Sequence, residues 1–71
     1  MTPSDRLSAA GRALYGQLWQ SALARDLGVN DRTMRRWAAG QEPPKTVWVD
    51  IRSLLASRRD QIRETLKVLP N

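Results

Sequence analysis

Apolar residues recur every three or four positions along most of the chain, the spacing of amphipathic helices. In the first such segment they are Leu7, Ala10, Leu14 and Leu18. Thr2 as N-cap and Asp5 as its capping-box partner, with a proline at the first helical position, predict where the helix starts. We expect this helix over roughly residues 3–15, ending near Gly16, with Gly11 allowing close packing at the edge of the apolar face.

Two shorter helices are expected next, separated by a tight turn. The stretch WQSALARDL, residues 19–27, has a helical apolar face, and Gly28 after it is a candidate left-handed terminator. Asn30 is a strong N-cap for a third helix over residues 31–39. Gly40 and the following Gln-Glu-Pro-Pro cannot continue that helix.

A long last helix is predicted over about residues 46–69, before Pro70 stops it. On a continuous helix one apolar stripe would contain Val47, Trp48, Ile51, Leu55, Ile62, Leu66 and Leu69. Such a helix would be about 36 Å long, more than the core of so small a domain can cover. The first half should pack on the helix pair before it, leaving the second half exposed.

Arg58 interrupts this stripe and leaves two interpretations open. The helix could break near residues 56–58 and fold back as two short core helices. We favour instead a continuous helix whose exposed residues Ile62, Leu66 and Leu69 form a homodimer interface. Arg58 would pair with Asp60 or Glu64 of a partner in the continuous helix, and would mark the break in the other interpretation.

The predicted fold class is all-α, because no segment shows sustained strand alternation. The 71 residues suffice for one domain with one core. We expect a four- to five-helix bundle with a helix-turn-helix at about residues 19–39 and a long C-terminal helix.

Charge and composition indicate the kind of partner and exclude several classes of functional site. The chain has 12 Lys+Arg, ten of them arginine, against 7 Asp+Glu, a net charge of +5 that favours a polyanionic partner: nucleic acid or an anionic membrane surface. It has no Cys and no His, which excludes zinc fingers, thiol nucleophiles and disulfides. We expect no enzymatic activity, metal, cofactor or small-molecule ligand. Without an apolar run of about 20 residues, a cytoplasmic protein is expected.

The third predicted helix has two distinct faces. Met34, Trp37 and Ala38 cluster within about 100°, while Arg32 and Arg36 point nearly opposite. By itself this pattern is also typical of a surface helix with solvated arginines. Aromatic residues could alternatively stack single-stranded nucleic acid; these are Tyr15, Trp19, Trp37 and Trp48. Core packing is the better interpretation for Trp37 and Trp48.

The spacing of small and apolar residues across the helix pair distinguishes these interpretations. Two helices that cross through a short turn need a small residue at the close approach, here Ala24, and a turn residue tolerant of positive φ, here Gly28. The remaining patterned positions are apolar: Leu23, Leu27, Val29, Met34 and Trp37.

The run QSALARDLGVNDRTMRRWAAG resembles the helix-turn-helix of the Xre-like group, which includes the lambdoid phage repressors and Cro proteins. The resemblance covers about residues 17–46. It implies a lambda-repressor-like fold whose second motif helix lies in the DNA major groove. The implied base-contacting residues are Asp31, Arg32, Thr33 and Arg36. The implied phosphate-contacting residues are Gln20, Asn30, Arg35 and Lys45.

The chemistry of these side chains agrees with the implied roles. Arginine pairs bidentately with guanine O6 and N7, and Arg32 and Arg36 lie one helical turn apart. Arg35 is better placed for phosphate. Asp31 departs from the usual uncharged residue of the group; it could accept from a cytosine amino group, but we favour a role in capping or in orienting Arg35.

The sequence therefore predicts a double-stranded DNA-binding transcriptional regulator, a homodimeric repressor acting on an inverted repeat. The resemblance and the size suggest a phage, prophage or plasmid operon, including the kind that controls anti-CRISPR genes. Two alternatives remain: an antitoxin that also binds a toxin through its last helix, and a membrane-surface protein that uses this basic amphipathic helix.

Overall fold

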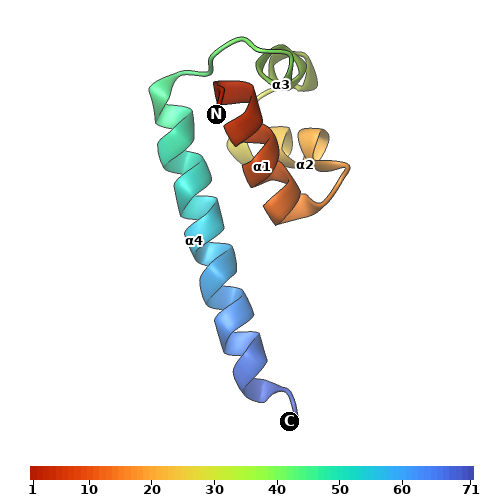
Figure 1. The fold of residues 1–71 in the computed structure, drawn as a ribbon, viewed down its shortest axis with the longest axis vertical. Coiled ribbons are helices and arrows are strands. Elements are labelled where there is room, and N and C mark those ends of the chain that lie inside the picture. The colour runs from red at the N-terminus through yellow and green to blue at the C-terminus, as the bar shows by residue number, and fades with distance from the viewer.

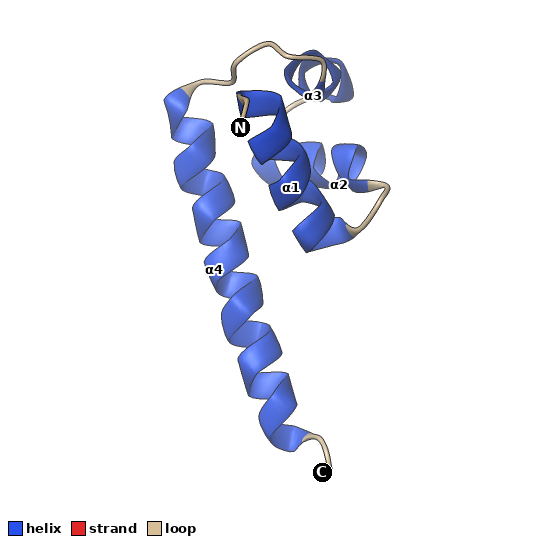
Figure 2. Cartoon of the chain, in the orientation of Figure 1, coloured by secondary structure: helices blue, strands red, loops and turns tan.

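The computed structural model describes all residues 1–71 and contains four helices and no strand. They are α1 (Pro3–Tyr15), α2 (Trp19–Leu27), α3 (Asp31–Ala38) and α4 (Lys45–Val68). In Figure 2 every element is helical, and α1 to α3 gather beside the first half of α4. The predicted all-α class and the long C-terminal helix are confirmed, with four helices rather than five.

The ends of α1 follow the predicted local chemistry. The Thr2 hydroxyl accepts from the backbone N–H of Asp5 at 3.1 Å, and the Asp5 carboxylate accepts from the Thr2 N–H at 3.2 Å. Gly16, at φ 82°, ends the helix. The prediction for Leu18 is wrong: the chain turns after Gly16, so Leu18 precedes α2 and is 91 % exposed instead of lying on the apolar face of α1.

One core holds the four helices together. Its buried apolar side chains are Leu7, Leu14, Trp19, Leu23, Ala24, Met34, Trp37, Val47 and Ile51. Gly11 makes the closest approach, because a Cβ at this position would lie 2.3 Å from the Trp19 ring. The predicted close packing at Gly11 is thus confirmed, and Trp19 is a core residue.

Helix α4 is continuous through residues 56–58, so the alternative of a broken helix is wrong. Its first half packs against α1 and α2, and its second half projects beyond them (Figure 1). The molecule accordingly measures 44 Å along its longest axis and only 24 and 22 Å across. None of the four helices combines the length and the apolar character that crossing a membrane requires.

Arg58 is the last residue that ties α4 to the other helices. Its guanidinium Nη1 donates to the carbonyl of Leu14, the penultimate residue of α1, at 2.7 Å. The interruption of the apolar stripe therefore has a structural cause within the chain and does not mark a break in the helix. Every residue after Arg58 is exposed.

Candidate nucleic-acid interface

The turn between α2 and α3 is held by backbone hydrogen bonds that require its small residues. Gly28 adopts the left-handed conformation, φ 74° and ψ 26°, which favours glycine. The Val29 N–H donates to the Ala24 carbonyl at 2.9 Å, and Ala24 is 1 % exposed. The two helices are thus joined by the predicted tight turn, which directs α3 away from α2.

Asn30 fixes the start of α3 and keeps one polar group free. Its side-chain oxygen accepts from the Thr33 N–H at 2.7 Å, as predicted for an N-cap. The side-chain amide still has its two N–H donors, and the residue is exposed. Asn30 can therefore cap the helix and donate to an external acceptor at the same time.

The two faces of α3 are separated as the helical pattern predicted. Met34 and Trp37 are buried, at 0 % and 5 % exposure, and fix the orientation of the helix. Arg32, Arg35 and Arg36 are all exposed. None of the three forms an ion pair, because the two ion pairs of the chain are Arg59–Asp60 and Lys67–Glu64, both in α4. The outer face of α3 therefore presents three uncompensated positive charges.

Asp31 does not orient Arg35, so that part of the prediction is wrong. Its carboxylate is exposed and makes no ion pair or hydrogen bond to the arginine one turn later. It does lie in the first turn of α3, where a negative charge is favourable near the positive end of the helix dipole. Of the two roles favoured for Asp31, capping or orienting Arg35, capping is thus the one compatible with this arrangement.

The remaining predicted contact residues lie at the edges of α3. Thr33 is half-buried and shares a shallow hollow with Trp37 and the loop of residues 41–45. Lys45 also lines this hollow and begins α4 in an exposed position. Gln20, the second residue of α2, is exposed as well. Of the proposed base readers, Thr33 is therefore the least accessible.

A polar contact between α1 and α2 was not expected from the sequence. The Tyr15 hydroxyl donates to the Asp26 carboxylate. Partial burial, followed by the hydrogen bond to Asp26 and its negative charge, raises the pKa of Tyr15 to about 12, while Arg58 and Arg25 oppose this shift. A tyrosine at the end of one helix and a carboxylate on the next were the only sequence signal.

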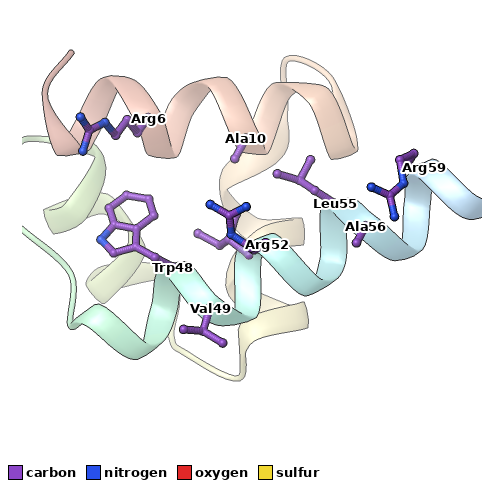
Figure 3. Close-up of a pocket in the computed structure, with 9 residues that line it drawn as sticks. Arg6, Ala10, Trp48, Val49, Arg52, Leu55, Ala56 and Arg59 are labelled. Atoms are coloured by element: carbon purple, nitrogen blue, oxygen red, sulfur yellow. The ribbon is translucent and has the colours of Figure 1, made fainter.

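A second missed feature is an open groove between α1 and α4 (Figure 3). Three of its nine lining residues are arginines, Arg6, Arg52 and Arg59, and none is acidic. Six are hydrophobic: Ala10, Trp48, Val49, Ile51, Leu55 and Ala56. The apolar stripe of the sequence contains three of these residues, but the spacing alone did not show that a groove remains between the helices.

The predicted dimer residues lie at the projecting end of the chain, two in α4 and Leu69 directly after it. Ile62, Leu66 and Leu69 are 53 %, 66 % and 56 % exposed, so nothing in the chain covers them. Because α4 starts after the loop from α3 and runs away from it, they are not brought together with the arginines of α3 (Figure 1). The chain also has no group of three or more carboxylate side chains placed to hold a metal ion.

Compared with known proteins, the chain matches no family model, no curated protein and no solved structure at a significant level.

Proposed function

We propose that the protein is a sequence-specific double-stranded DNA-binding regulator that places α3 in the major groove. The observation that carries this proposal is the outer face of α3, where Arg32, Arg35 and Arg36 are exposed and have no carboxylate partner. The opposite face is fixed in the core by Met34 and Trp37. A rigid helix with a free cationic face matches the way a helix-turn-helix presents its second helix to DNA.

The three arginines have different roles in this proposal. Arg32 and Arg36 lie on the centre of the exposed face, one turn apart, so they can address neighbouring guanines through O6 and N7. Arg35 lies toward the flank and binds phosphate, which adds affinity without sequence information. Asp31, free of Arg35, either complements the helix dipole alone or accepts from a cytosine amino group.

Phosphate contacts come from exposed polar groups around α3. Asn30 offers its free amide, Gln20 its side chain at the start of α2, and Lys45 its ammonium at the start of α4. These groups hold the backbone on both sides of α3 and fix its register in the groove.

The regulator is a homodimeric repressor that binds an inverted repeat and blocks a promoter by occupying it. Two helix-turn-helix units on one face of DNA require half-sites about one helical turn, 10 to 10.5 bp, or a multiple of it apart. The projecting half of α4, with Ile62, Leu66 and Leu69 uncovered, supplies an apolar surface for pairing. A phage, prophage or plasmid operon is the proposed setting, on the strength of the helix-turn-helix resemblance.

The test compares single arginine variants on specific and random DNA. Footprinting on the DNA upstream of the protein's own reading frame defines the site, and fluorescence anisotropy then measures binding to it. Arg32→Ala and Arg36→Ala should each weaken specific binding by about 1–3 kcal/mol and relax the preference at one base pair. Arg35→Ala should weaken binding to specific and random DNA alike, with a smaller salt dependence.

Arg12→Ala is the matched control, since it removes one exposed positive charge from the last turn of α1 and leaves α3 unchanged. It should reduce specific binding much less than either reader variant. If Arg32→Ala and Arg36→Ala left the ratio of specific to random binding unchanged, α3 would not read bases. Binding to anionic vesicles in place of DNA, unaffected by both variants, would point to the membrane-surface alternative.

A further inference from the structure

We define the arm as residues 59–69, which comprise the exposed end of α4 and Leu69 directly after it. Three of its aliphatic side chains, Ile62, Leu66 and Leu69, are each more than half exposed, and no residue of the arm is buried. A helix that exposes several apolar side chains along one stripe, with no covering partner, is unusual in a small domain. The arm therefore presents an unpartnered surface.

Six apolar residues, five in α4 and Leu69 directly after it, are spaced symmetrically along the chain. The six residues Trp48, Ile51, Leu55, Ile62, Leu66 and Leu69 are separated by three, four, seven, four and three positions. The spacing is therefore the same read from either end, with its centre between Arg58 and Arg59. Trp48 mirrors Leu69, Ile51 mirrors Leu66, and Leu55 mirrors Ile62.

Such mirror symmetry is what an antiparallel pair of identical helices requires. In a two-fold dimer each residue meets its mirror position on the partner, and the reverse contact follows by symmetry. An antiparallel α4 pair centred between Arg58 and Arg59 would place the arm residues of one copy against the first-half residues of the other. Each of these six residues would then lie opposite another residue of the set.

The first half of α4 has the space for this contact. Trp48, Ile51 and Leu55, the mirror positions of the arm residues, all line the groove between α1 and α4 (Figure 3). Trp48 and Leu55 are only half-buried within the chain. The groove therefore lies where the arm of a second copy would arrive.

Interface size also argues against pairing through the arms alone. A stable interface buries about 800 Å² on each partner, and three part-exposed aliphatic side chains supply only a fraction of that area. When each arm inserts into the groove of the other copy, Trp48, Val49 and Leu55 of both copies join the contact. The groove is thus the surface that the arm needs.

We propose that two copies of the chain pair antiparallel along α4, each arm seated in the α1–α4 groove of the other. This deepens the homodimer of the proposed function and rests on it, but it is tested without DNA. It adds Arg6, Trp48, Arg52 and Leu55 to the interface that the sequence had confined to the arm.

Charge gives this pairing a recognisable salt dependence. The groove contains Arg6, Arg52 and Arg59 without a carboxylate, and the arm also carries an excess of positive charge. Apolar burial must then overcome repulsion between like charges, so added salt should strengthen the dimer. An acidic amphipathic partner or an anionic lipid surface in the same groove would be released by salt.

The register is tested by disulfide formation in a chain that has no cysteine of its own. In the proposed pair Arg52 lies within about 1.5 Å, along the helix axis, of Leu66 of the other copy, because one residue rises 1.5 Å. Both residues are exposed, so their replacement leaves the core intact. The Arg52→Cys, Leu66→Cys double variant should oxidise to a linked dimer on a non-reducing gel.

The two single variants are the matched controls. Arg52→Cys alone and Leu66→Cys alone each place the two thiols of a dimer about 20 Å apart along the axes, too far for a bond. The double variant cannot bridge within one chain for the same reason. We expect about tenfold more linked dimer from the double variant than from either single variant.

Light scattering of the cysteine-free chain at micromolar concentrations, at low and high salt, completes the test. A dimer that tightens with salt, together with disulfides in the double variant alone, supports the proposal. Three results would overturn it. One is a monomer, and another is a dimer in which the single variant Leu66→Cys is linked, as expected for a parallel pair. The third is a dimeric protein whose double variant forms no disulfide. A monomer that binds an acidic amphipathic peptide or phosphatidylglycerol vesicles through the groove assigns the groove to that partner instead. None of these results changes the outcome of the arginine variants on DNA.

Discussion

The two halves of α4 have similar apolar spacing but different surroundings. In the first half Val47 and Ile51 are 8 % and 3 % exposed, packed in the core that α1, α2 and α3 complete. In the arm Ile62 and Leu66 are 53 % and 66 % exposed. Helical periodicity thus identifies the face of a helix that needs covering, but the amount of remaining chain decides how much of it is covered from within.

The boundary between the two halves is chemical as well as geometric. Arg58 donates to the Leu14 carbonyl, whereas Arg59, the next residue, pairs only with the adjacent Asp60 in an exposed ion pair. We define the body as the residues from α1 to Arg58, which are joined by packing and hydrogen bonds. The arm, in contrast, is held by its own helical hydrogen bonds. The body and the arm should respond differently to the same perturbation.

The largest difference is expected from one truncation made at two positions of α4. Ile51→Ala removes buried methyl groups and should lower the free energy of unfolding by about 2–5 kcal/mol. Ile62→Ala makes the same chemical change at an exposed position and should alter it by at most about 0.5 kcal/mol in the monomer. Urea denaturation at low protein concentration measures both values.

Repeating the measurement over a range of protein concentrations separates folding from pairing. If the arm contacts a second copy, the difference in the free energy of unfolding between wild type and Ile62→Ala should grow with protein concentration. The reason is that the wild type becomes dimeric and dimer formation stabilises only the folded state. An equal loss for Ile51→Ala and Ile62→Ala in dilute solution would mean that the arm is packed against its own body.

A smaller difference is expected from two adjacent arginines. Arg58→Met keeps most of the apolar stem but removes the hydrogen bond to Leu14. It should lower the free energy of unfolding by about 1.5 kcal/mol. Arg59→Met removes one exposed ion pair and should change the free energy of unfolding of the monomer by at most about 0.5 kcal/mol. Thermal unfolding of the dilute proteins compares them. Equal stability of the two variants would show that the Arg58 contact does not anchor α4.

The body was largely predictable from the sequence because its signals are local. Thr2 with Asp5, Gly28 and Asn30 act within a few residues of themselves, and each adopts the predicted conformation or hydrogen bond. The two faces of α3 followed from its spacing, since Met34 and Trp37 are buried and the arginines exposed.

The failures come from contacts between residues distant in the chain. The partner of Arg58 is 44 positions away, and no periodicity could identify a backbone carbonyl of α1 as its acceptor. The α1–α4 groove depends likewise on how two helices are spaced in the fold. Leu18 is the exception, because its failure is local: it has the apolar spacing of α1, but Gly16 has already ended the helix.

The smallest effect is expected at alkaline pH, and it acts on the body. The ordinary pKa of tyrosine is about 10, and that of Tyr15 is raised to about 12 in the folded chain. Folding therefore favours the neutral hydroxyl, whose stabilising contribution is complete below pH 10 and is lost as the pH rises from 10 to 12. Because Tyr15 is only partly buried, the loss should be on the order of 1 kcal/mol.

Tyr15 is the only tyrosine, so the absorbance change near 295 nm on phenolate formation reports this residue alone. Tyr15→Phe is the matched control: it keeps the ring but has no proton to lose, so the Tyr15-dependent part of the decline between pH 10 and 12 should disappear. All other side chains are the same in both proteins, so their contributions cancel in the comparison. A titration midpoint near pH 10 in the folded protein would mean that the hydroxyl does not depend on Asp26, and that α1 and α2 are held together by packing such as that of Gly11 on Trp19.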